Sequence, residues 1–404
     1  MTTDLTSAVR QADLLAVPAA RGTCPFDPPP AYEQARRRAP VVPVRLFDGT
    51  ATWMIAGYHE VRQVLGDPRF SADDRAPGFP FLSAGRRELV TERRAFIRMD
   101  DPEHARLRRM LTGEFMLKRI EELRPRVQEL ADELLDRMIA GRREADLVAE
   151  FALPLPSLVI CMMLGVPYED HEYFQACSRT LLDNSAKPEQ LAAARDGLVE
   201  YMHRLAEGKR REPDGGIVSR LIERGELSPD EVASMCLLLL IAGHETTANM
   251  TALSVLALLR NPRQLARLRM EPEVTRDAVE ELLRYLSIVH TGLPRVATED
   301  VTVGGRLIRA GEGVLCMLST ANRDEAVFPG ADELDLDHPA RRHVAFGFGV
   351  HQCLGQPLAR LELQIALDRI LQRLPGLRLN ADFDGLRFRH DLVVYGVYEL
   401  PVAW

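Results

Sequence analysis

A glycine-rich stretch around one cysteine, residues 346–360, has the composition of a metal-binding loop. It reads FGFGVHQCLGQPLAR, and an apolar helical pattern begins directly after it. Gly347, Gly349 and Gly355 allow backbone conformations, or the close approach of a flat ligand, that a side chain would forbid. Cys353 lies just before the expected helix, where backbone N–H groups and the helix dipole favour a thiolate. The loop is therefore suited to holding a metal through sulfur, although a lone cysteine is more often a small buried apolar residue.

A second stretch combines a long apolar helical pattern with polar residues at its centre. Residues 237–250 read LLLLIAGHETTANM. Gly243 in a helix costs up to about 1 kcal/mol relative to alanine, and Glu245 is expensive to bury without a partner. Thr246 and Thr247 follow directly. A glycine and an acid in the middle of an apolar helix both go against local structural preferences, and such exceptions in one place indicate a functional site. The simpler interpretation of the same pattern is a helix with one exposed polar face.

Two further pairs of residues have the spacing of neighbours on a helix. Asp101 and Pro102 suit a helix start, and His104 and Arg108 then project from one face of it. A solvated basic helix gives the same pattern. Glu281 and Arg284 form an E-x-x-R pair, but the chain repeats this spacing elsewhere, as is typical of surface helices, for example at Glu33 and Arg36, Glu121 and Arg124, and Glu273 and Arg276.

These sequence motifs, in their order along the chain, closely resemble those of the cytochrome P450 superfamily. The motif F-G-x-G-x-H-x-C-x-G followed by L-A-R is similar to the haem-binding loop of that family. The motif A-G-x-[DE]-T-[TS] at residues 242–247 is similar to its oxygen-activation motif. The resemblance implies that haem b is bound with the Cys353 thiolate as axial ligand of the iron. It also implies that Phe346 packs against the haem near the sulfur and that His351 hydrogen-bonds a propionate. Gly347 and Gly355 belong to the same loop.

The resemblance assigns roles to the remaining residues. His104, Arg108 and Arg295 would bind haem propionates, and Ala242 and Gly243 would lie beside the haem. Thr246 would hold water in hydrogen bonds during oxygen activation, and Glu245 would relay protons from solvent. Glu281 and Arg284 would form a buried structural ion pair that holds the cysteine loop. The third member of that network is usually an arginine where this chain has His338, so either His338 or one of the nearby Arg341 and Arg342 takes its place. An apolar substrate pocket is expected from Phe79, Phe81, Leu82, Leu238, Ala242, Thr291, Leu293 and Val394.

These residues must be positioned by a mainly helical fold with small β-sheets, an α+β cytochrome P450 fold. We expect one domain over residues 1–404, with the haem buried between the oxygen-activation helix and the cysteine loop. Residues 1–30 should form an extended arm, residues 41–55 a hairpin that turns at Asp48 and Gly49, and residues 58–65 a helix. Residues 70–91 read as an irregular segment, and 120–223 as amphipathic helices that include a fully buried stretch at 158–164 and a cavity roof at 173–188. Alternating apolar residues after 290 predict a small sheet.

Composition restricts the setting of the protein. The chain has 404 residues and a formal net charge of -8, which argues against nucleic acid as a partner. Its six cysteines form no CxxC pair, which is typical of a reducing compartment. No secretory signal is evident, and the longest apolar run, 235–259, contains His244, Glu245 and Asn249, which a lipid-spanning helix tolerates poorly. We therefore expect a cytoplasmic monomer without a membrane segment.

The expected function is that of a haem-thiolate monooxygenase of the soluble actinobacterial type, which serves secondary metabolism. It would hydroxylate a bulky hydrophobic molecule of polyketide, macrolide, statin-like, steroid or secosteroid type, using O2. Electrons would come from NAD(P)H through a ferredoxin reductase and a ferredoxin, with Arg106 and Arg109 as candidate docking charges.

Three alternatives remain open from the sequence. A peroxide-driven haem peroxygenase would generally replace the acid and alcohol that stand here as Glu245 and Thr246. A non-catalytic haem-binding accessory protein would be expected to lose Cys353 or Thr246. A zinc site made from His351 and Cys353 lacks a second pair of ligands nearby.

Overall fold

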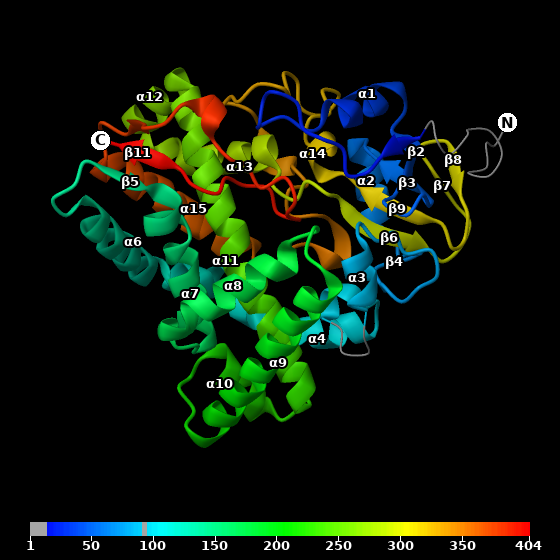
Figure 1. Ribbon diagram of the computed structural model, residues 1–404, viewed down its shortest axis with the longest axis horizontal. Coiled ribbons are helices and arrows are strands. Elements are labelled where there is room, and N and C mark those ends of the chain that lie inside the picture. The colour runs from blue at the N-terminus through cyan, green and yellow to red at the C-terminus, as the bar shows by residue number, and fades with distance from the viewer. Residues whose placement is uncertain (1–13, 91–94) are drawn as a thin grey trace.

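The computed structural model describes residues 14–90 and 95–404, which form a helical body with a sheet region on one side (Figure 1). The helices are α1 (Pro30–Arg38), α2 (Tyr58–Gly66), α3 (Ala84–Glu88), α4 (Glu103–Thr112), α5 (Leu117–Glu122), α6 (Arg124–Ile139), α7 (Pro154–Leu164), α8 (His171–Leu182), α9 (Pro188–Arg211), α10 (Ile217–Arg224), α11 (Pro229–Arg260), α12 (Pro262–Met270), α13 (Thr275–Leu286), α14 (Leu318–Ala321) and α15 (Gln356–Arg373). The mainly helical class predicted from the sequence is confirmed.

The strands form three small sheets. They are β1 (Leu15–Ala16), β2 (Val41–Arg45), β3 (Ala51–Ile55), β4 (Phe70–Ser71), β5 (Glu144–Asp146), β6 (Leu293–Ala297), β7 (Val301–Val303), β8 (Arg306–Ile308), β9 (Gly313–Cys316), β10 (Arg378–Leu379) and β11 (Pro401–Ala403). The orders are β1-β2-β3-β9-β6-β4, β10-β11-β5 and β7-β8. β2 and β3 form the expected antiparallel hairpin, and Gly49 supplies the positive φ, 85°, that its turn requires.

One local expectation needs correction. In the N-terminal arm, whose residues 1–13 lie outside the described part of the chain, β1 is an extended strand that pairs in parallel with β2. The segment after residue 70, irregular in our prediction, contains β4 and the five-residue helix α3. The Ser83 hydroxyl caps α3 by accepting a hydrogen bond from the Arg86 backbone N–H. A helix this short shows no periodicity, so the sequence pattern could not reveal it.

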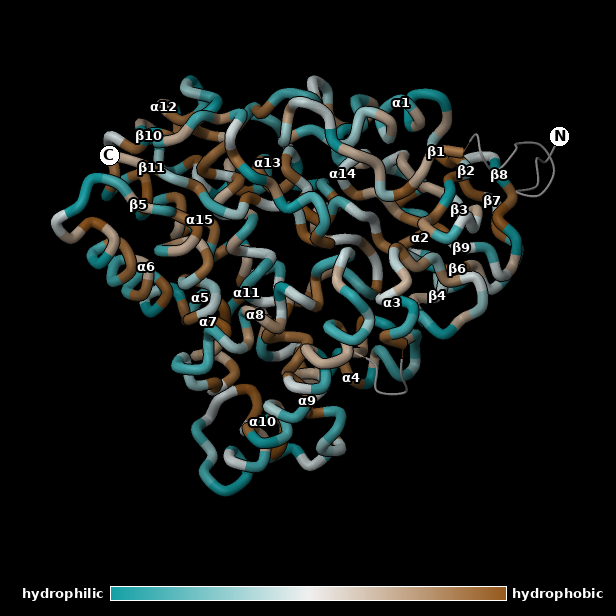
Figure 2. Tube along the Cα trace, in the orientation of Figure 1, coloured by the Kyte–Doolittle hydropathy of each residue, from teal (hydrophilic) through white to brown (hydrophobic). Residues whose placement is uncertain are grey.

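The helix α11 is the centre of the helical body (Figure 1). It begins at a capping box in which Ser228 and Glu231 satisfy each other's backbone N–H groups, and it packs against α7, α9 and α15. In the stretch 158–164 of α7, expected to be fully buried, Leu158 is half-buried and Met162 is exposed, whereas the other five residues are buried. The outer helix α6 alternates hydrophobic and hydrophilic residues (Figure 2) and turns its apolar face toward α15. Among the described residues, no helix is long and apolar enough to cross a membrane.

A buried ion pair on α13 connects the helical body to the segment that precedes the cysteine loop. Glu281 and Arg284 are completely buried, and two hydrogen bonds of 2.7 Å join their side chains. Arg284 also donates to the backbone carbonyls of Asn322, Ala331 and Glu333. One guanidinium group therefore satisfies carbonyls from a long loop that would otherwise be left unpaired.

The structure resolves which residue completes this network. His338 places Nδ1 2.9 Å from the Glu281 carboxylate and Nε2 2.7 Å from the Pro329 carbonyl. Both partners are acceptors, so the ring donates to both only when each nitrogen carries a proton. Arg341 instead pairs with Asp277 at the surface, and Arg342 donates to the Val327 carbonyl. His338 thus occupies the position for which the sequence left three candidates.

Replacing Arg284 with alanine should lower the free energy of unfolding by about 3–5 kcal/mol, because the buried Glu281 carboxylate loses its guanidinium partner and three backbone carbonyls lose their donor. The matched control is Arg341→Ala, which breaks an exposed ion pair with Asp277 and should cost no more than about 1 kcal/mol. Urea unfolding followed by circular dichroism measures both. Similar small losses in the two variants would contradict the structural role of the buried pair.

Candidate active site

The cysteine loop is a tight turn held by its own backbone. The Cys353 N–H donates to the Phe346 carbonyl at 2.9 Å. Gly349 has a φ of 74°, and a Cβ atom at this position would lie 2.2 Å from the Leu65 carbonyl oxygen. Only glycine permits that approach of the loop to α2. The loop leads directly into α15, which has proline in its first turn.

The surroundings of the Cys353 sulfur combine exposure with desolvation. Cys353 is exposed, yet burial is the strongest influence on its thiol and raises the pKa. Both observations hold if the exposed surface faces an internal hollow rather than bulk solvent. Four groups act against the rise by favouring the thiolate: the N–H groups of Gly355 and Gln356 and the side chains of Arg108 and Arg360.

The middle of α11 has an open stripe on one face. Ala242 is exposed although His244 and Glu245 beside it are buried, and Leu238 and Thr246, one turn to either side, are half-buried. The Thr246 hydroxyl donates to the Ala242 carbonyl at 2.7 Å, the back-bond that bends helices. This stripe is the surface that the sequence assigns to the haem and substrate. Gly243 lies on another side, where a Cβ atom would come within 2.8 Å of Ile160 on α7, so its immediate effect is close helix packing.

Basic side chains from four segments converge beside the loop. The His104 and His351 rings lie 4.0 Å apart. The pKa of His351 is lowered to about 3, most strongly by burial and then by the charges of Arg295, His104, Arg108 and Arg98. Arg98 was not predicted from the sequence, and burial lowers its own pKa to about 10. So many basic groups in a desolvated place repel one another unless an anion neutralises them.

The donors of this cluster suit a ligand with carboxylate groups. His104 Nδ1 lies 3.0 Å from the Asp101 carboxylate, whereas its buried Nε2 has no hydrogen-bond partner within the described protein. Arg108 donates to the Gln352 carbonyl at 2.6 Å and Arg295 to the Pro294 carbonyl at 2.7 Å, so each of these hydrogen bonds is made to a backbone carbonyl. A flat dianionic cofactor with a thiolate-binding metal fits this donor set, and haem b has those properties.

A second cluster of charged side chains holds the cysteine loop on the side that faces α13. Glu280 on α13 accepts hydrogen bonds from Arg360 at 2.6 and 3.0 Å and lies 3.2 Å from His343 Nε2. Arg360 also stacks on the Phe346 ring, 4.6 Å from its centre. Burial alone would raise the pKa of Glu280, but His343 and Arg360 outweigh it and lower the pKa to about 2. This cluster could not be predicted from the sequence, in which its members are single charges in helical patterns.

The proton-relay residue predicted from the sequence is held by an ion pair. Glu245 is completely buried, and its Oε2 lies 2.9 Å from Arg389 Nη1. Asn249 donates to the Glu245 carbonyl oxygen at 2.6 Å. A further buried acid, Glu362 on α15, has its pKa raised to about 8 by burial, against a hydrogen bond from Thr247 that lowers it. Neither Arg389 nor Glu362 was predicted.

The predicted pocket residues divide into groups. The Phe79 and Phe81 rings lie 5.0 Å apart, Leu293 is the nearest neighbour of the place where Gly347 would carry a side chain, and Val394 pairs with Val289. Thr291 is buried with an unpartnered hydroxyl. Leu82 packs instead into the core beneath the large sheet, with Tyr32 and Met317 among its neighbours, a place that the sequence did not predict.

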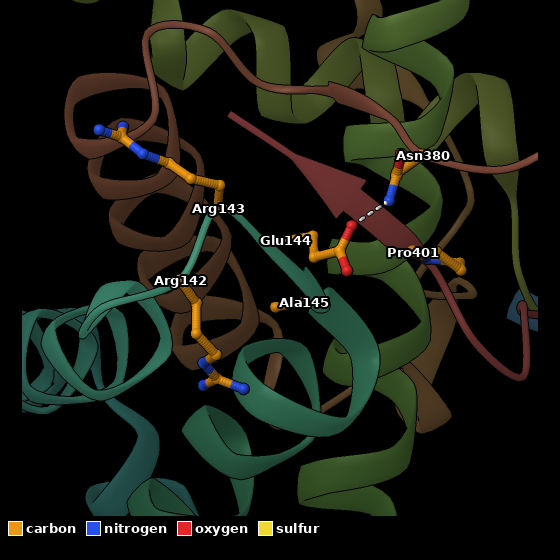
Figure 3. Close-up of a pocket in the computed structure, with 6 residues that line it drawn as sticks. All are labelled: Arg142, Arg143, Glu144, Ala145, Asn380 and Pro401. Carbon is orange, nitrogen blue, oxygen red and sulfur yellow. Dashed lines mark hydrogen bonds between the residues drawn. The ribbon is translucent and has the colours of Figure 1, made fainter.

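Two features that could compete with this site do not do so. The polar pocket of Figure 3, about 660 Å³, is lined by Arg142, Arg143, Glu144, Ala145, Asn380 and Pro401, none of which belongs to the cysteine loop or to α11. Asn380 donates to Glu144 across it. No group of three His, Cys, Asp or Glu side chains in residues 14–90 and 95–404 could hold a metal ion, so the zinc alternative gains no support.

The candidate docking charges differ in their surroundings. Arg106 pairs with both Glu103 and Glu231, whereas Arg109 is exposed. The first is therefore engaged within the protein, and the second is available at the surface.

Comparison with known proteins identifies the family. The cytochrome P450 family model matches residues 33–375. The chain is 62% identical over 403 residues to cytochrome P450-SU2 of Streptomyces griseolus, covering 99% of this chain and 100% of that one. It is 46% identical to vitamin D3 dihydroxylase of the same species, with full coverage of both. The structure of the mycinamicin VIII C21 methyl hydroxylase MycCI of Micromonospora griseorubida, bound to mycinamicin VIII, matches with a TM-score of 0.91 at 41% identity, covering 97% of this chain and 100% of that one.

The chain belongs to the cytochrome P450 family. It is a haem-thiolate monooxygenase whose cofactor is haem b, and it has the relatives of the soluble actinobacterial type. This confirms the superfamily, the fold class, the enzyme class and the cofactor that the sequence predicted. The roles of single residues toward the haem stay predictions.

The acid stability of the protein should depend on Glu280. Its pKa in the folded protein, about 2, lies below the ordinary value of 4.5, so its contribution is present above pH 4.5 and is lost as the pH falls toward 2. Unfolding of the wild type and Glu280→Gln is compared between pH 3 and 7. The stability advantage of the wild type should shrink as the pH falls through this window; an advantage independent of pH would contradict the assignment.

Proposed function

We propose that the protein hydroxylates a bulky hydrophobic molecule at a haem held between the open stripe of α11 and the cysteine loop. The observation that carries this proposal is the buried basic cluster beside Cys353, in which burial lowers the pKa of His351 to about 3 and the buried Nε2 of His104 has no hydrogen-bond partner among the described residues. In it, the Cys353 thiolate is the axial ligand, and His104, Arg108, Arg295 and His351 bind the propionates. Arg98, from the same cluster, is added to this set.

The side chains divide the remaining tasks. When bound, a haem with a thiolate ligand supplies the activation of O2 for insertion of one oxygen atom into a C–H bond. Phe346, on whose ring Arg360 stacks, is proposed to pack against the haem near the sulfur and to exclude water there. The Thr246 hydroxyl donates to Ala242, which leaves its oxygen lone pairs to accept hydrogen bonds from a water on the open stripe. Glu245 then delivers protons toward that water through its free Oε1.

The substrate class follows from the lining and from the relatives. Leu238 and Ala242 on the stripe, Leu293 and the Phe79–Phe81 pair offer apolar surface. Two relatives are named for vitamin D3 and for mycinamicin VIII. A bulky polyketide, macrolide or secosteroid is therefore proposed for this chain too. We also propose that a ferredoxin, reduced by NAD(P)H through its reductase, supplies electrons and docks near exposed Arg109.

Titration of the purified protein with compounds of each class tests this proposal through visible absorption. A change from low-spin to high-spin haem with one class, followed by a hydroxylated product with ferredoxin, reductase and NAD(P)H, supports it. Peroxide that replaces the whole electron supply at the same rate would favour the peroxygenase alternative. Absence of haem absorption, even when haem is supplied during expression, would contradict the function altogether.

Replacing Thr246 with alanine should uncouple electron use from product formation, because the hydroxyl that holds water on the stripe is lost. The fraction of NAD(P)H electrons recovered in product should fall about tenfold or more, with peroxide released in its place. Thr246→Ser keeps the hydroxyl and should retain most of the coupling. Unchanged coupling in the alanine variant would exclude Thr246 from proton delivery.

A further inference from the structure

A hairpin near the end of the chain reaches into the body and contacts α11. This terminal hairpin, residues 388–397, is closed by pairing of Phe388 with Val397 and by a 2.8 Å hydrogen bond from the Arg389 N–H to the Gly396 carbonyl. A Cβ atom on Gly396 would lie 1.7 Å from the Asn249 side-chain oxygen on α11. Glycine is therefore required for this approach, which brings the hairpin onto the turn of α11 that follows Glu245.

The Arg389 side chain completes the contact by pairing with Glu245. The exposed fractions of the two side chains are 5% and 0%, and a 2.9 Å hydrogen bond joins them. Asn249 lies 3.3 Å from the same carboxylate oxygen, Oε2. A desolvated cation at this distance stabilises the ionised carboxylate and fixes its direction. The Oε2 atom of Glu245 is thus turned toward the hairpin, while Oε1 has no hydrogen-bond partner among the described residues.

The same hairpin also contacts both ends of the expected substrate cavity. Its Val393 N–H donates to the Leu182 carbonyl at the end of α8, the roof predicted from the sequence, and its Asp391 carbonyl accepts from the Asn184 N–H, each at 2.9 Å. On the other side the Tyr395 N–H donates to the Ile288 carbonyl at 2.8 Å. Val394, a predicted pocket residue, lies between these contacts. One short segment therefore joins the roof, the wall and the acid of α11.

We propose that Arg389 is a positioning residue that makes proton delivery by Glu245 depend on the position of the roof and of the substrate. The proposal rests on the function proposed above. With the hairpin seated, the Arg389 cation favours the ionised Glu245 carboxylate. A displacement of the hairpin at Val393 or Val394 moves Arg389 away, and the unpaired carboxylate then takes up a proton that originates in solvent. When Arg389 returns, it favours the ionised form again, and the proton passes to the water that Thr246 holds.

The test compares three variants. Arg389→Gln removes the cation, Arg389→Lys keeps it, and Arg387→Gln is the matched control, because Arg387 lies two residues away in an exposed pair with Glu399. The first readout is the infrared signal of the Glu245 carboxyl group in the resting protein, identified by subtracting the spectrum of Glu245→Gln. The second is the fraction of NAD(P)H electrons recovered in hydroxylated product.

In Arg389→Gln we expect a protonated carboxyl band that the wild type lacks, together with coupling lower by about tenfold. Arg389→Lys should restore the ionised band and most of the coupling, a rescue that a purely structural role would not give. Arg387→Gln should match the wild type. If Arg389→Gln does not fold, Gly396→Ala, which pushes the hairpin away from Asn249, should show the same band.

A wild-type infrared signal and wild-type coupling in Arg389→Gln would overturn the proposal, and so would a failure of lysine to restore either. Failure of the proposed hydroxylase function can be distinguished from failure of this proposal. If the wild-type protein binds haem but forms no product, the infrared signal of Glu245 can still be measured. In that case a changed band with Arg389→Gln would keep the link between Arg389 and Glu245 and refute only its place in hydroxylation.

Discussion

The structure depends on the neutralisation of charges that the fold buries. Burial opposes the ionised forms of Cys353, His351 and Glu280, and each is answered differently. Glu280 has its cation within the protein. The thiolate of Cys353 is favoured by helix N–H groups but not enough to lower its pKa. The basic cluster around His351 includes His104, whose buried Nε2 has no hydrogen-bond partner among the described residues, so the cluster is suited to a ligand that carries carboxylates.

The fold answers this requirement by fixing the cysteine loop from two sides. On one side Glu280, His343 and Arg360 reach Phe346. On the other, Gly349 lies against the end of α2. The pair of Glu281 with Arg284 holds the long segment leading to the loop. The loop therefore keeps its shape through contacts that do not involve the Cys353 sulfur, which suits a site that must receive a cofactor.

Features that depend on short local sequence motifs could be predicted from the sequence, whereas features that depend on tertiary contacts could not. The hairpin of β2 and β3, the helix with His104 and the central helix α11 could be predicted because their turn residues and periodicity are local. The stripe of Ala242 and Thr246 followed from helical spacing. Arg98, Arg389 and Glu280 could not be predicted, because each is one charge in a segment without a distinctive pattern and gains its meaning only from distant partners. The sequence left open whether His338 completes the network of Glu281 and Arg284. Only the structure showed that the His338 ring bridges Glu281 and the Pro329 carbonyl.

The bond between the Cys353 sulfur and the haem iron is the central claim. Resonance Raman spectroscopy of the haem-loaded protein measures it most directly, using protein labelled with a heavy sulfur isotope in cysteine. The account predicts an iron–sulfur stretching band that shifts with the isotope and disappears in Cys353→His, while the wild-type shift survives replacement of each of the other five cysteines. A band that ignores the sulfur isotope, or that persists without Cys353, would contradict it.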